Sequence, residues 1–368
     1  MNNYTKKYFP NLDALRFFAF LLVFLEHMVL TNDPALKGSS WISFYNSHFN
    51  LASVGVGFFI VLSGFLITWI ILEEYQNTSH FNLSNFWLRR CLRIWPLYFL
   101  MIFIGYILII SARYIYNSPV HDMPPLAYLF SFTLNFYMAN HGTAFLFFIA
   151  FLWSISMEEQ FYTLWGIILK WAKSLLPFIC FLLIAGSVVF RFIYKADNNT
   201  MYYNSLNWIG NFAIGSLVAY FVAKGRKHFN IPKAVTALIY LVFIFNLLFY
   251  NSIYASEVMT IIERLIGSLF FAFILIDQTF NENSLFSFRN NNKLKYLGKI
   301  SYGLFCYHGL VILLFSRFIQ HFSQLNTPLY VFLICPLITF ALTVLVSAIS
   351  YEYVEKPIMR LRYKIKPA

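Results

Sequence analysis

The stretch that decides the fold is residues 13–27, DALRFFAFLLVFLEH. It is apolar enough to enter a bilayer, yet Arg16 lies near one end, and Glu26 and His27 lie near the other. Charged side chains in a membrane-inserted helix cost about 2.5–3.5 kcal/mol each on insertion scales, so they are rare unless they serve a function. On a helix, the spacing of Arg16 and His27 corresponds to about three turns and about 16 Å. We therefore expect a cation and an imidazole on one helix face, one toward each membrane surface.

The composition indicates a membrane protein. Of the 368 residues, 60% are hydrophobic and 11% are charged, whereas soluble domains carry about 25% charged residues. A net charge of +12 is found in nucleic-acid-binding proteins, but Lys and Arg also collect in the cytoplasmic loops of membrane proteins. We therefore predict an all-α polytopic membrane protein whose partner is the lipid bilayer, and no nucleic-acid partner.

Apolar windows of about 20 residues, the length that crosses a bilayer as a helix, mark the expected spans. The loops rich in lysine and arginine all lie on the cytoplasmic side only if the apolar stretch near residues 125–150 enters the membrane and leaves it on the same side. Such a re-entrant segment must line a cavity or be buried in protein. We predict both termini in the cytoplasm and ten transmembrane helices, near residues 12–31, 49–72, 94–113, 154–171, 175–194, 204–223, 232–251, 258–280, 298–317 and 328–350.

The cysteines do not suggest a metal site. Cys91, Cys180, Cys306 and Cys335 lie in or beside apolar segments, and no two of them form a Cys-x-x-Cys pair. This spacing predicts neither a disulfide framework nor a zinc site, and we expect no metal.

Two strings near the second and third predicted spans have both a structural and a functional interpretation. Residues 55–67, GVGFFIVLSGFLI, contain small residues that allow helices to approach closely. Residues 89–96, RRCLRIWP, contain Arg89, Arg90 and Arg93, of which Arg89 and Arg93 are neighbours on a helix. These arginines either anchor the chain at the cytoplasmic surface or clamp a phosphate group.

Three further strings contain polar residues in apolar surroundings. Residues 153–162, WSISMEEQFY, place Ser156, Glu158 and Glu159 near the start of a span, where acids also favour a helix N-terminus. Residues 297–308, LGKISYGLFCYH, place Tyr302 and His308 in a span, where a histidine is either packed and hydrogen-bonded or functional. The chain then closes with residues 350–357, SYEYVEKP, which contain Glu355.

In this order, the six strings resemble the acyltransferase 3 family of integral membrane O-acyltransferases, from about residue 10 to about residue 360. The resemblance implies transfer of an acyl group, usually acetyl from cytoplasmic acetyl-CoA, to a hydroxyl of an extracytoplasmic glycan or lipid-linked saccharide. It also implies a multi-pass protein of the bacterial inner membrane. Some relatives carry an added SGNH hydrolase-like domain; we expect residues 1–368 to form a single transmembrane domain of the stand-alone kind.

The residues and the resemblance suggest the same division of roles. Histidine is the usual general base at neutral pH, so His27 is the expected base for the acceptor hydroxyl, and Glu158 is the expected carboxylate that orients it. We favour direct attack on acyl-CoA over a relay through an acyl-enzyme on Tyr302 or a serine. The phosphates of acyl-CoA need cations, and the candidates are Arg16, Arg89, Arg90 and Arg93. Further candidate site residues are Ser156, Glu159, His308 and Glu355.

A multi-span transporter of polysaccharide or solute is the alternative, since it would also be basic inside and contain buried charges. A transporter does not require the Arg16/His27 pair together with the acidic string at residues 153–162. A hydrolase of the Ser-His-Asp type has little support, because the chain has no G-x-S-x-G string. The motifs do not specify the acceptor: O-antigen of lipopolysaccharide, capsule, another exopolysaccharide, peptidoglycan and a small secondary metabolite all fit. Its selectivity is expected in outer loops near residues 32–48, 114–124 and 195–203.

Overall fold

The computed structural model describes residues 8–29, 33–114, 123–143, 147–225, 228–322 and 327–361, and these ranges contain helices and no strand. The elements before residue 172 are α1 (Pro10–His27), α2 (Pro34–Lys37), α3 (Ser40–His48), α4 (Leu51–Thr78), α5 (Leu83–Tyr114), α6 (Leu126–Phe130), α7 (Leu134–His141), α8 (Phe147–Ala150) and α9 (Leu152–Trp171). Those that follow are η1 (Lys173–Leu175), α10 (Leu176–Tyr194), α11 (Asn198–Tyr203), α12 (Ser205–Lys224), α13 (Lys233–Leu248), α14 (Tyr250–Ile253), α15 (Glu257–Phe280), α16 (Asn292–Lys299), α17 (Ser301–Gln320), η3 (Tyr330–Ile334), α18 (Cys335–Ser350), η4 (Tyr351–Glu355) and α19 (Lys356–Arg360).

The predicted polytopic all-α fold is confirmed. In the described part of the chain, seven helical segments are long and apolar enough to cross a membrane: Ile42–Thr78, Leu83–Tyr114, Lys173–Tyr194, Asn198–Lys224, Glu257–Phe280, Ser301–Ile319 and Tyr330–Arg360. The other three predicted spans fall on the helices α1, α9 and α13. Helix α1 has 18 residues and includes Asp13, Arg16 and Glu26, whereas α13 is apolar but has 16 residues. That these three also cross the membrane stays a prediction.

The predicted re-entrant region is divided into short helices. Helices α6, α7 and α8 have five, eight and four residues, far fewer than the roughly 20 that cross a bilayer. Phe132, between α6 and α7, has a φ of 54°, which breaks the helical path. The hydroxyl of Tyr98 donates to the carbonyl of Leu129 at 2.9 Å, and Gln160 donates to that of Phe132 at 2.6 Å. Irregular backbone at membrane depth needs such partners inside the protein.

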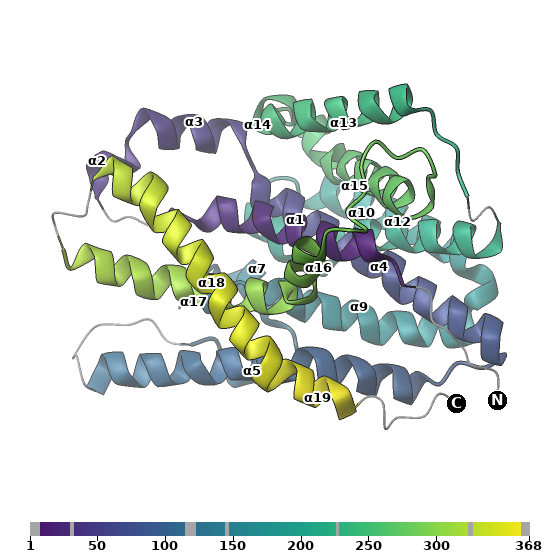
Figure 1. Cartoon of the computed structure of the whole chain (residues 1–368), viewed down its shortest axis with the longest axis horizontal. Coiled ribbons are helices and arrows are strands. Elements are labelled where there is room, and N and C mark those ends of the chain that lie inside the picture. Colours follow the sequence, from purple (N-terminus) through teal and green to yellow (C-terminus); the bar gives the residue numbers. More distant parts are fainter. Residues whose placement is uncertain are drawn as a thin grey trace.

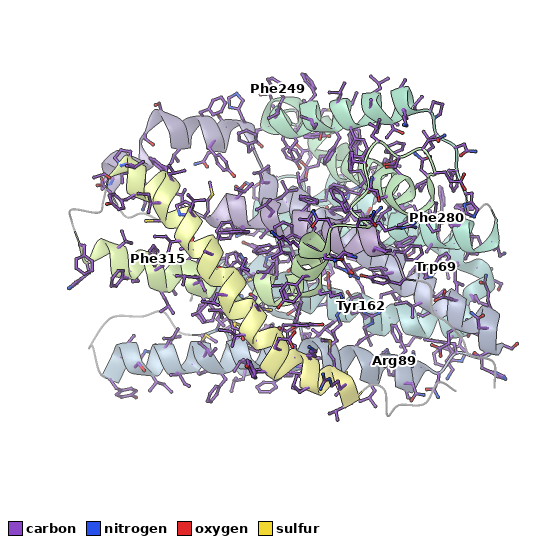
Figure 2. All side chains as sticks on the ribbon, in the orientation of Figure 1. Trp69, Arg89, Tyr162, Phe249, Phe280 and Phe315 are labelled. Atoms are coloured by element: carbon purple, nitrogen blue, oxygen red, sulfur yellow. The ribbon has the colours of Figure 1, made fainter. Side chains whose placement is uncertain are left out.

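Helix α1 lies inside the bundle, with α13 and α5 on opposite sides of it (Figure 1). It contacts α4, α16 and α17, while α4 also packs along α12. Two glycines permit the α4–α12 contact: a Cβ atom at Gly64 would lie 2.1 Å from the carbonyl oxygen of Phe212, and one at Gly215 would lie 1.9 Å from that of Val61. The small residues of α4 therefore serve helix packing, as their pattern suggested. Trp69 of the same helix packs against Phe280 with ring centroids 5.9 Å apart (Figure 2).

Glu26 at the end of α1 has a structural partner. Its Oε2 accepts a hydrogen bond from the backbone N–H of Leu51, the first residue of α4, at 2.9 Å. Backbone N–H groups at a helix start have no partner within the helix, and a carboxylate there also interacts favourably with the helix dipole. Glu26 thus joins the end of α1 to the start of α4.

The predicted orientation in the membrane depends partly on charges outside the described residues. These include Lys6, Lys7, Arg226, Lys227, Arg362, Lys364 and Lys366, and most of the predicted outer loop near residues 114–124 lies there too. The cytoplasmic location of both termini therefore stays a prediction.

Candidate active site

A pocket of about 820 Å³ lies between α1, α4, α5, α9 and α17. Hydrophobic side chains make up half of its lining, and its polar side chains are concentrated on the first four of these helices. We call it the arginine pocket, after three of its polar residues; the polar lining is Arg16, Ser63, Arg90, Arg93, Ser154, Glu158, Tyr162, Ser301 and Tyr302.

Three guanidinium groups meet in the arginine pocket. Arg90 and Arg93 are one helical turn apart on α5, and Arg16 enters from α1. Nη1 of Arg16 lies 2.6 Å from Oδ1 of Asp13, which fixes its position. The guanidinium of Arg90 lies over the ring of Tyr162, 5.5 Å from the centroid. Guanidinium groups held in a mostly apolar cavity form strong, directional hydrogen bonds to phosphate or carboxylate oxygens.

Glu158 belongs to a closed hydrogen-bond network in the same pocket. The hydroxyl of Tyr162 donates to its Oε2 at 2.7 Å, and that of Ser63 donates to its Oε1 at 3.2 Å. The two hydroxyl oxygens are 3.0 Å apart. The i, i+4 spacing of Glu158 and Tyr162 could have indicated their contact. Ser63 comes from α4, and no spacing in the sequence relates it to α9.

Arg89 is separated from the other arginines. Its Nη2 lies 3.0 Å from Oε2 of Glu74, near the end of α4, and its side chain is 26% exposed. Figure 2 shows Arg89 on α5 and Tyr162 toward the middle of the bundle. Successive residues of a helix point about 100° apart, and here Arg89 points to Glu74 while Arg90 lines the pocket. The structure thus selects Arg90 and Arg93 as the pair from α5.

A second pocket, of about 860 Å³, contains His27. We call it the histidine pocket. Its lining includes the short helix α11 and the start of α9, and consists of Val23, His27, Ala52, Val56, Met138, Ala150, Phe151, Trp153, Asn198, Asn199, Tyr202, Tyr203 and Phe305. Val56 and Phe305 line both pockets, so the two cavities are neighbours within the bundle. Arg16 and His27, at the two ends of α1, therefore belong to adjoining cavities.

The hydrogen bond of His27 assigns its tautomer. Its Nδ1 lies 2.8 Å from the carbonyl oxygen of Val23. A carbonyl can only accept, so Nδ1 carries the hydrogen, and Nε2 keeps a free electron pair that can take a proton. Phe151 packs against the ring with centroids 4.5 Å apart, and the ring of His308 lies 5.8 Å away. His27 is therefore held in one tautomer, in which Nε2 is able to accept a proton.

The described residues give Glu158 partners other than His27, so the structure does not support the orienting role that we expected of it. The described residues contain no hydrogen bond between the two; Glu158 is bonded to Ser63 and Tyr162 instead. Near α9, the ring that packs against His27 belongs to Phe151, which directly precedes the first residue of that helix. Glu158 follows seven residues later, which is about 10 Å along a helix. The hydrogen-bond acceptor at Nδ1 of His27 is the backbone carbonyl of Val23, where we expected a carboxylate.

Two other candidates from the acidic string have structural partners. The hydroxyl of Ser156, which is fully buried, lies 3.3 Å from that of Tyr98. Glu159 accepts a hydrogen bond from the indole N–H of Trp95 at 3.2 Å. Both contacts join α9 to α5, and neither candidate is among the residues that line the two pockets.

The three candidates near the end of the chain, Tyr302, His308 and Glu355, lie in different surroundings. Tyr302 lines the arginine pocket, and its hydroxyl donates to the carbonyl of Ile94 at 2.7 Å. Glu355 is buried and accepts from the hydroxyl of Ser350 at 3.4 Å. His308 is fully buried, and its Nε2 has no hydrogen-bond partner in the described part of the chain. Of the three, Tyr302 is the one that lines the arginine or histidine pocket among the described residues.

The chain is similar in sequence to known O-acetyltransferases. The O-acetyltransferase OatA of Staphylococcus aureus (strain NCTC 8325) is 24% identical over 98% of this chain and 59% of its own length. The peptidoglycan O-acetyltransferase OatA of Listeria monocytogenes is 25% identical over 97% of this chain and 57% of its own. The chain thus spans less than two thirds of these relatives, and no solved structure matches it significantly. A family model described as an acyltransferase domain matches residues 9–348, and the chain therefore belongs to the acyltransferase 3 family.

Proposed function

We propose that this membrane protein transfers an acetyl group from acetyl-CoA to a hydroxyl of a cell-envelope glycan. The observation that carries the proposal is the adjacency of the two pockets: one holds three guanidinium groups, the other holds a histidine whose Nδ1 is bonded to the Val23 carbonyl, and they share Val56 and Phe305. Membership of the acyltransferase 3 family supports it. The names of the relatives add support, because they describe O-acetyltransferases, one of them acting on peptidoglycan.

The arginine pocket is the proposed site of the donor. Acyl-CoA is a strongly anionic substrate, and Arg16, Arg90 and Arg93 provide fixed donors that match phosphate oxygens. The ion pair of Arg16 with Asp13 uses Nη1, and within the described ranges its other guanidinium nitrogens have no hydrogen-bond partner that would compete with a phosphate. Hydrophobic side chains such as Ile60 cover the rest of the cavity, where an uncharged acyl group can lie.

His27 is the proposed general base. Its Nε2 removes the proton of the acceptor hydroxyl while the hydroxyl oxygen attacks the thioester carbonyl carbon. A carbon–oxygen bond forms, the carbon–sulfur bond breaks, and the thiolate of CoA leaves with the electron pair of that bond. The thiolate is then protonated, for which the imidazolium of His27 is one source. The products are an acetylated glycan and free CoA, so that atoms and charge balance.

Direct transfer is favoured over a covalent relay. Val56 and Phe305 line both the donor and the acceptor pocket, so an acetyl group that passes between these two side chains would reach His27 without a covalent carrier. The relay remains a defined alternative, because the hydroxyl of Ser63 is bonded to Glu158 inside the donor pocket, and Tyr302 also lines it. In the direct route Glu158 instead holds Tyr162 and Ser63 in place and balances the charge of the arginines.

The proposed topology places the arginine pocket toward the cytoplasm, where acetyl-CoA is made, and the histidine pocket toward the cell envelope. This assigns the protein to the bacterial cytoplasmic membrane, with both termini in the cytoplasm. Peptidoglycan is the acceptor that the relatives favour. O-antigen and exopolysaccharide belong to the same chemical class and are the alternative acceptors.

The test uses purified protein in nanodiscs with acetyl-CoA and glycan acceptors. We expect release of free CoA and a glycan heavier by one acetyl group. His27→Ala should lower this rate by roughly 10²–10⁴-fold, the usual contribution of a general base. The matched control is His141→Ala, because His141 is an exposed histidine on α7 outside both pockets. Equal activity of the two variants would remove His27 as the base, and failure of the wild type to consume acetyl-CoA with any acceptor would overturn the proposal.

A further inference from the structure

The histidine pocket has one wall that no part of the proposed chemistry uses. This wall is helix α11, whose residues Asn198, Asn199, Tyr202 and Tyr203 line the pocket together with Trp153 of α9. The two asparagines are exposed, and the two tyrosines are partly exposed. None of the thirteen residues lining the pocket is a lysine, an arginine or a carboxylate. A ligand of this wall is therefore recognised by neutral amides, hydroxyls and aromatic rings.

Helix α11 is held in place through its last three carbonyl groups. Each of them, at residues 201, 202 and 203, accepts a hydrogen bond from a side-chain N–H. The donors are Nδ2 of Asn207, the indole N–H of Trp208 at 2.7 Å and Nδ2 of Asn135 at 3.2 Å. Terminal carbonyls have no partner within their own helix, and these three donors fix the end of α11 to α12 and α7.

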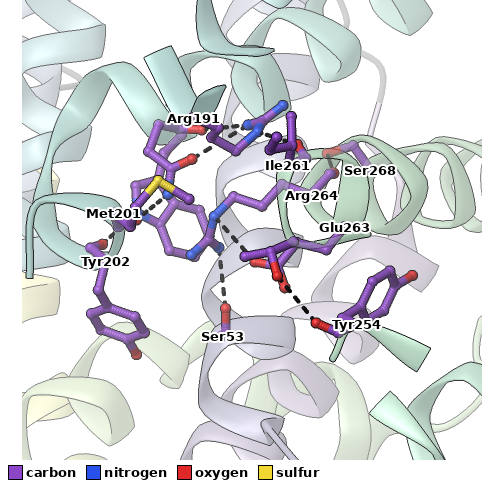
Figure 3. Close-up of polar contacts among 12 residues, drawn as sticks. Ser53, Arg191, Met201, Tyr202, Tyr254, Ile261, Glu263, Arg264 and Ser268 are labelled. Atoms are coloured by element: carbon purple, nitrogen blue, oxygen red, sulfur yellow. Dashed lines mark hydrogen bonds and ion pairs between the residues drawn. The ribbon is translucent and has the colours of Figure 1, made fainter. Parts of the chain in front are cut away.

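Two buried arginines support this wall from behind (Figure 3). The guanidinium of Arg264 lies over the ring of Trp208 at 3.5 Å from the centroid and donates to the hydroxyl of Ser53 at 3.1 Å. Arg191 donates to the carbonyl of Asn207 at 3.0 Å. Asn207 and Trp208, which donate to the carbonyls of residues 201 and 202, are thus each in contact with an arginine guanidinium. A wall that is fixed in this way before a ligand arrives loses little freedom when it binds.

The tyrosines and Trp153 form an aromatic group at the pocket. The ring centroid of Trp153 lies 5.2 Å from that of Tyr202 and 5.3 Å from that of Tyr203. Aromatic faces carry partial negative charge and attract C–H groups that carry partial positive charge. A pyranose ring has this character on its faces, while its hydroxyl and acetamido groups project from its edges. Asparagine amides both donate and accept, so they pair with those edge groups.

We propose that α11 is the acceptor subsite: a neutral pyranose ring packs against Tyr202, Tyr203 and Trp153 beside His27, and Asn198 and Asn199 select its edge substituents. The inference rests on the proposed function, since it names the part of the acceptor that the histidine pocket recognises. It also assigns acceptor selectivity to one of the three outer loops expected from the sequence, residues 195–203. Because the thirteen described lining residues include no lysine, arginine or carboxylate, they favour an uncharged sugar ring over a phosphorylated one.

The experiment compares two soluble probes, the β-1,4-linked tetramers of N-acetylglucosamine and of glucose, which differ in the acetamido group. Wild type, Asn198→Ala, Asn199→Ala and Tyr203→Leu are assayed in nanodiscs with acetyl-CoA, and acetyl-CoA affinity is measured separately. Asn290→Ala is the matched control, because Asn290 is exposed and lies outside both pockets. We expect a KM for the preferred tetramer raised roughly tenfold in the α11 variants, as loss of about 1.4 kcal/mol would give. Their affinity for acetyl-CoA should be unchanged.

The selectivity between the two tetramers decides the inference. A change in the ratio of their kcat/KM values in Asn198→Ala or Asn199→Ala supports it, since a general loss of folding would lower both values equally. Unchanged KM and unchanged selectivity in all three variants would overturn it and leave the proposed function intact. If the wild type acetylates neither tetramer but acetylates a charged envelope glycan, the sugar class assigned to α11 is wrong. If it does not bind acetyl-CoA, the proposed function itself fails.

Discussion

Val56 on α4 and Phe305 on α17 are the two residues that line both the arginine pocket and the histidine pocket. Phe305 also packs against Phe59, with ring centroids 6.0 Å apart, so the boundary between the pockets is apolar. An apolar boundary of this kind hinders ions and water while it admits an uncharged acyl group. In the proposed mechanism, the thioester of the donor and the hydroxyl of the acceptor would come together at this boundary.

Enlarging Val56 should slow transfer more than it weakens binding of the donor. In Val56→Phe the added ring fills the boundary, and we expect the rate of transfer to fall about tenfold or more, which corresponds to at least about 1.4 kcal/mol. The dissociation constant of acetyl-CoA, measured by calorimetry in nanodiscs, should rise less than the transfer rate falls, because the arginines are untouched although Val56 also lines their pocket. Val235→Phe, on the exposed side of α13, is the control. Normal transfer by Val56→Phe would mean that the acetyl group takes another path.

Two adjacent arginines provide a matched test of donor binding. Arg90→Ala removes a guanidinium from the arginine pocket, and loss of hydrogen bonds to a charged group costs about 1.5–3 kcal/mol. We expect acetyl-CoA affinity to fall by roughly tenfold or more. Arg89→Ala should have little effect on affinity, because Arg89 faces Glu74 and not the pocket. Equal losses in the two variants would indicate a general role in folding or topology.

Ser63 separates direct transfer from a relay. In the direct mechanism Ser63→Ala keeps His27 and the arginines, so transfer should persist within several-fold of the wild type. Mass analysis of wild-type protein incubated with acetyl-CoA alone should then find no acetyl group on Ser63 or Tyr302. Complete loss of transfer in Ser63→Ala, together with an acetylated Ser63 in the wild type, would establish the relay.

The crossing of α4 and α12 should not tolerate a methyl group. In Gly215→Ala the new Cβ would lie 1.9 Å from the carbonyl oxygen of Val61, and overpacking typically costs about 1–3 kcal/mol. We expect a lower unfolding temperature in detergent. Gly186→Ala on α10 is the control, since its Cβ meets nothing within 4 Å and alanine favours a helix by up to about 1 kcal/mol over glycine. Equal stability of the two variants would contradict the close α4–α12 contact.

The sequence by itself determined what lies within one helix. The apolar windows predicted the all-α polytopic fold, and the six strings identified the family. The eleven-residue spacing in α1 put Arg16 and His27 at opposite ends of one helix, where they face adjoining pockets. Rise and rotation per residue are fixed for an α-helix, so relationships of this kind can be read from numbering alone.

The tertiary structure decided which residues from different helices meet. It joined Glu158 to Ser63 rather than to His27, selected Arg90 over Arg89, and made Glu26 a cap for α4. It also turned part of a predicted outer loop into the wall α11. These outcomes depend on the depth at which each helix starts and on where glycines let helices cross closely. Neither quantity is encoded in the spacing of residues along a single segment.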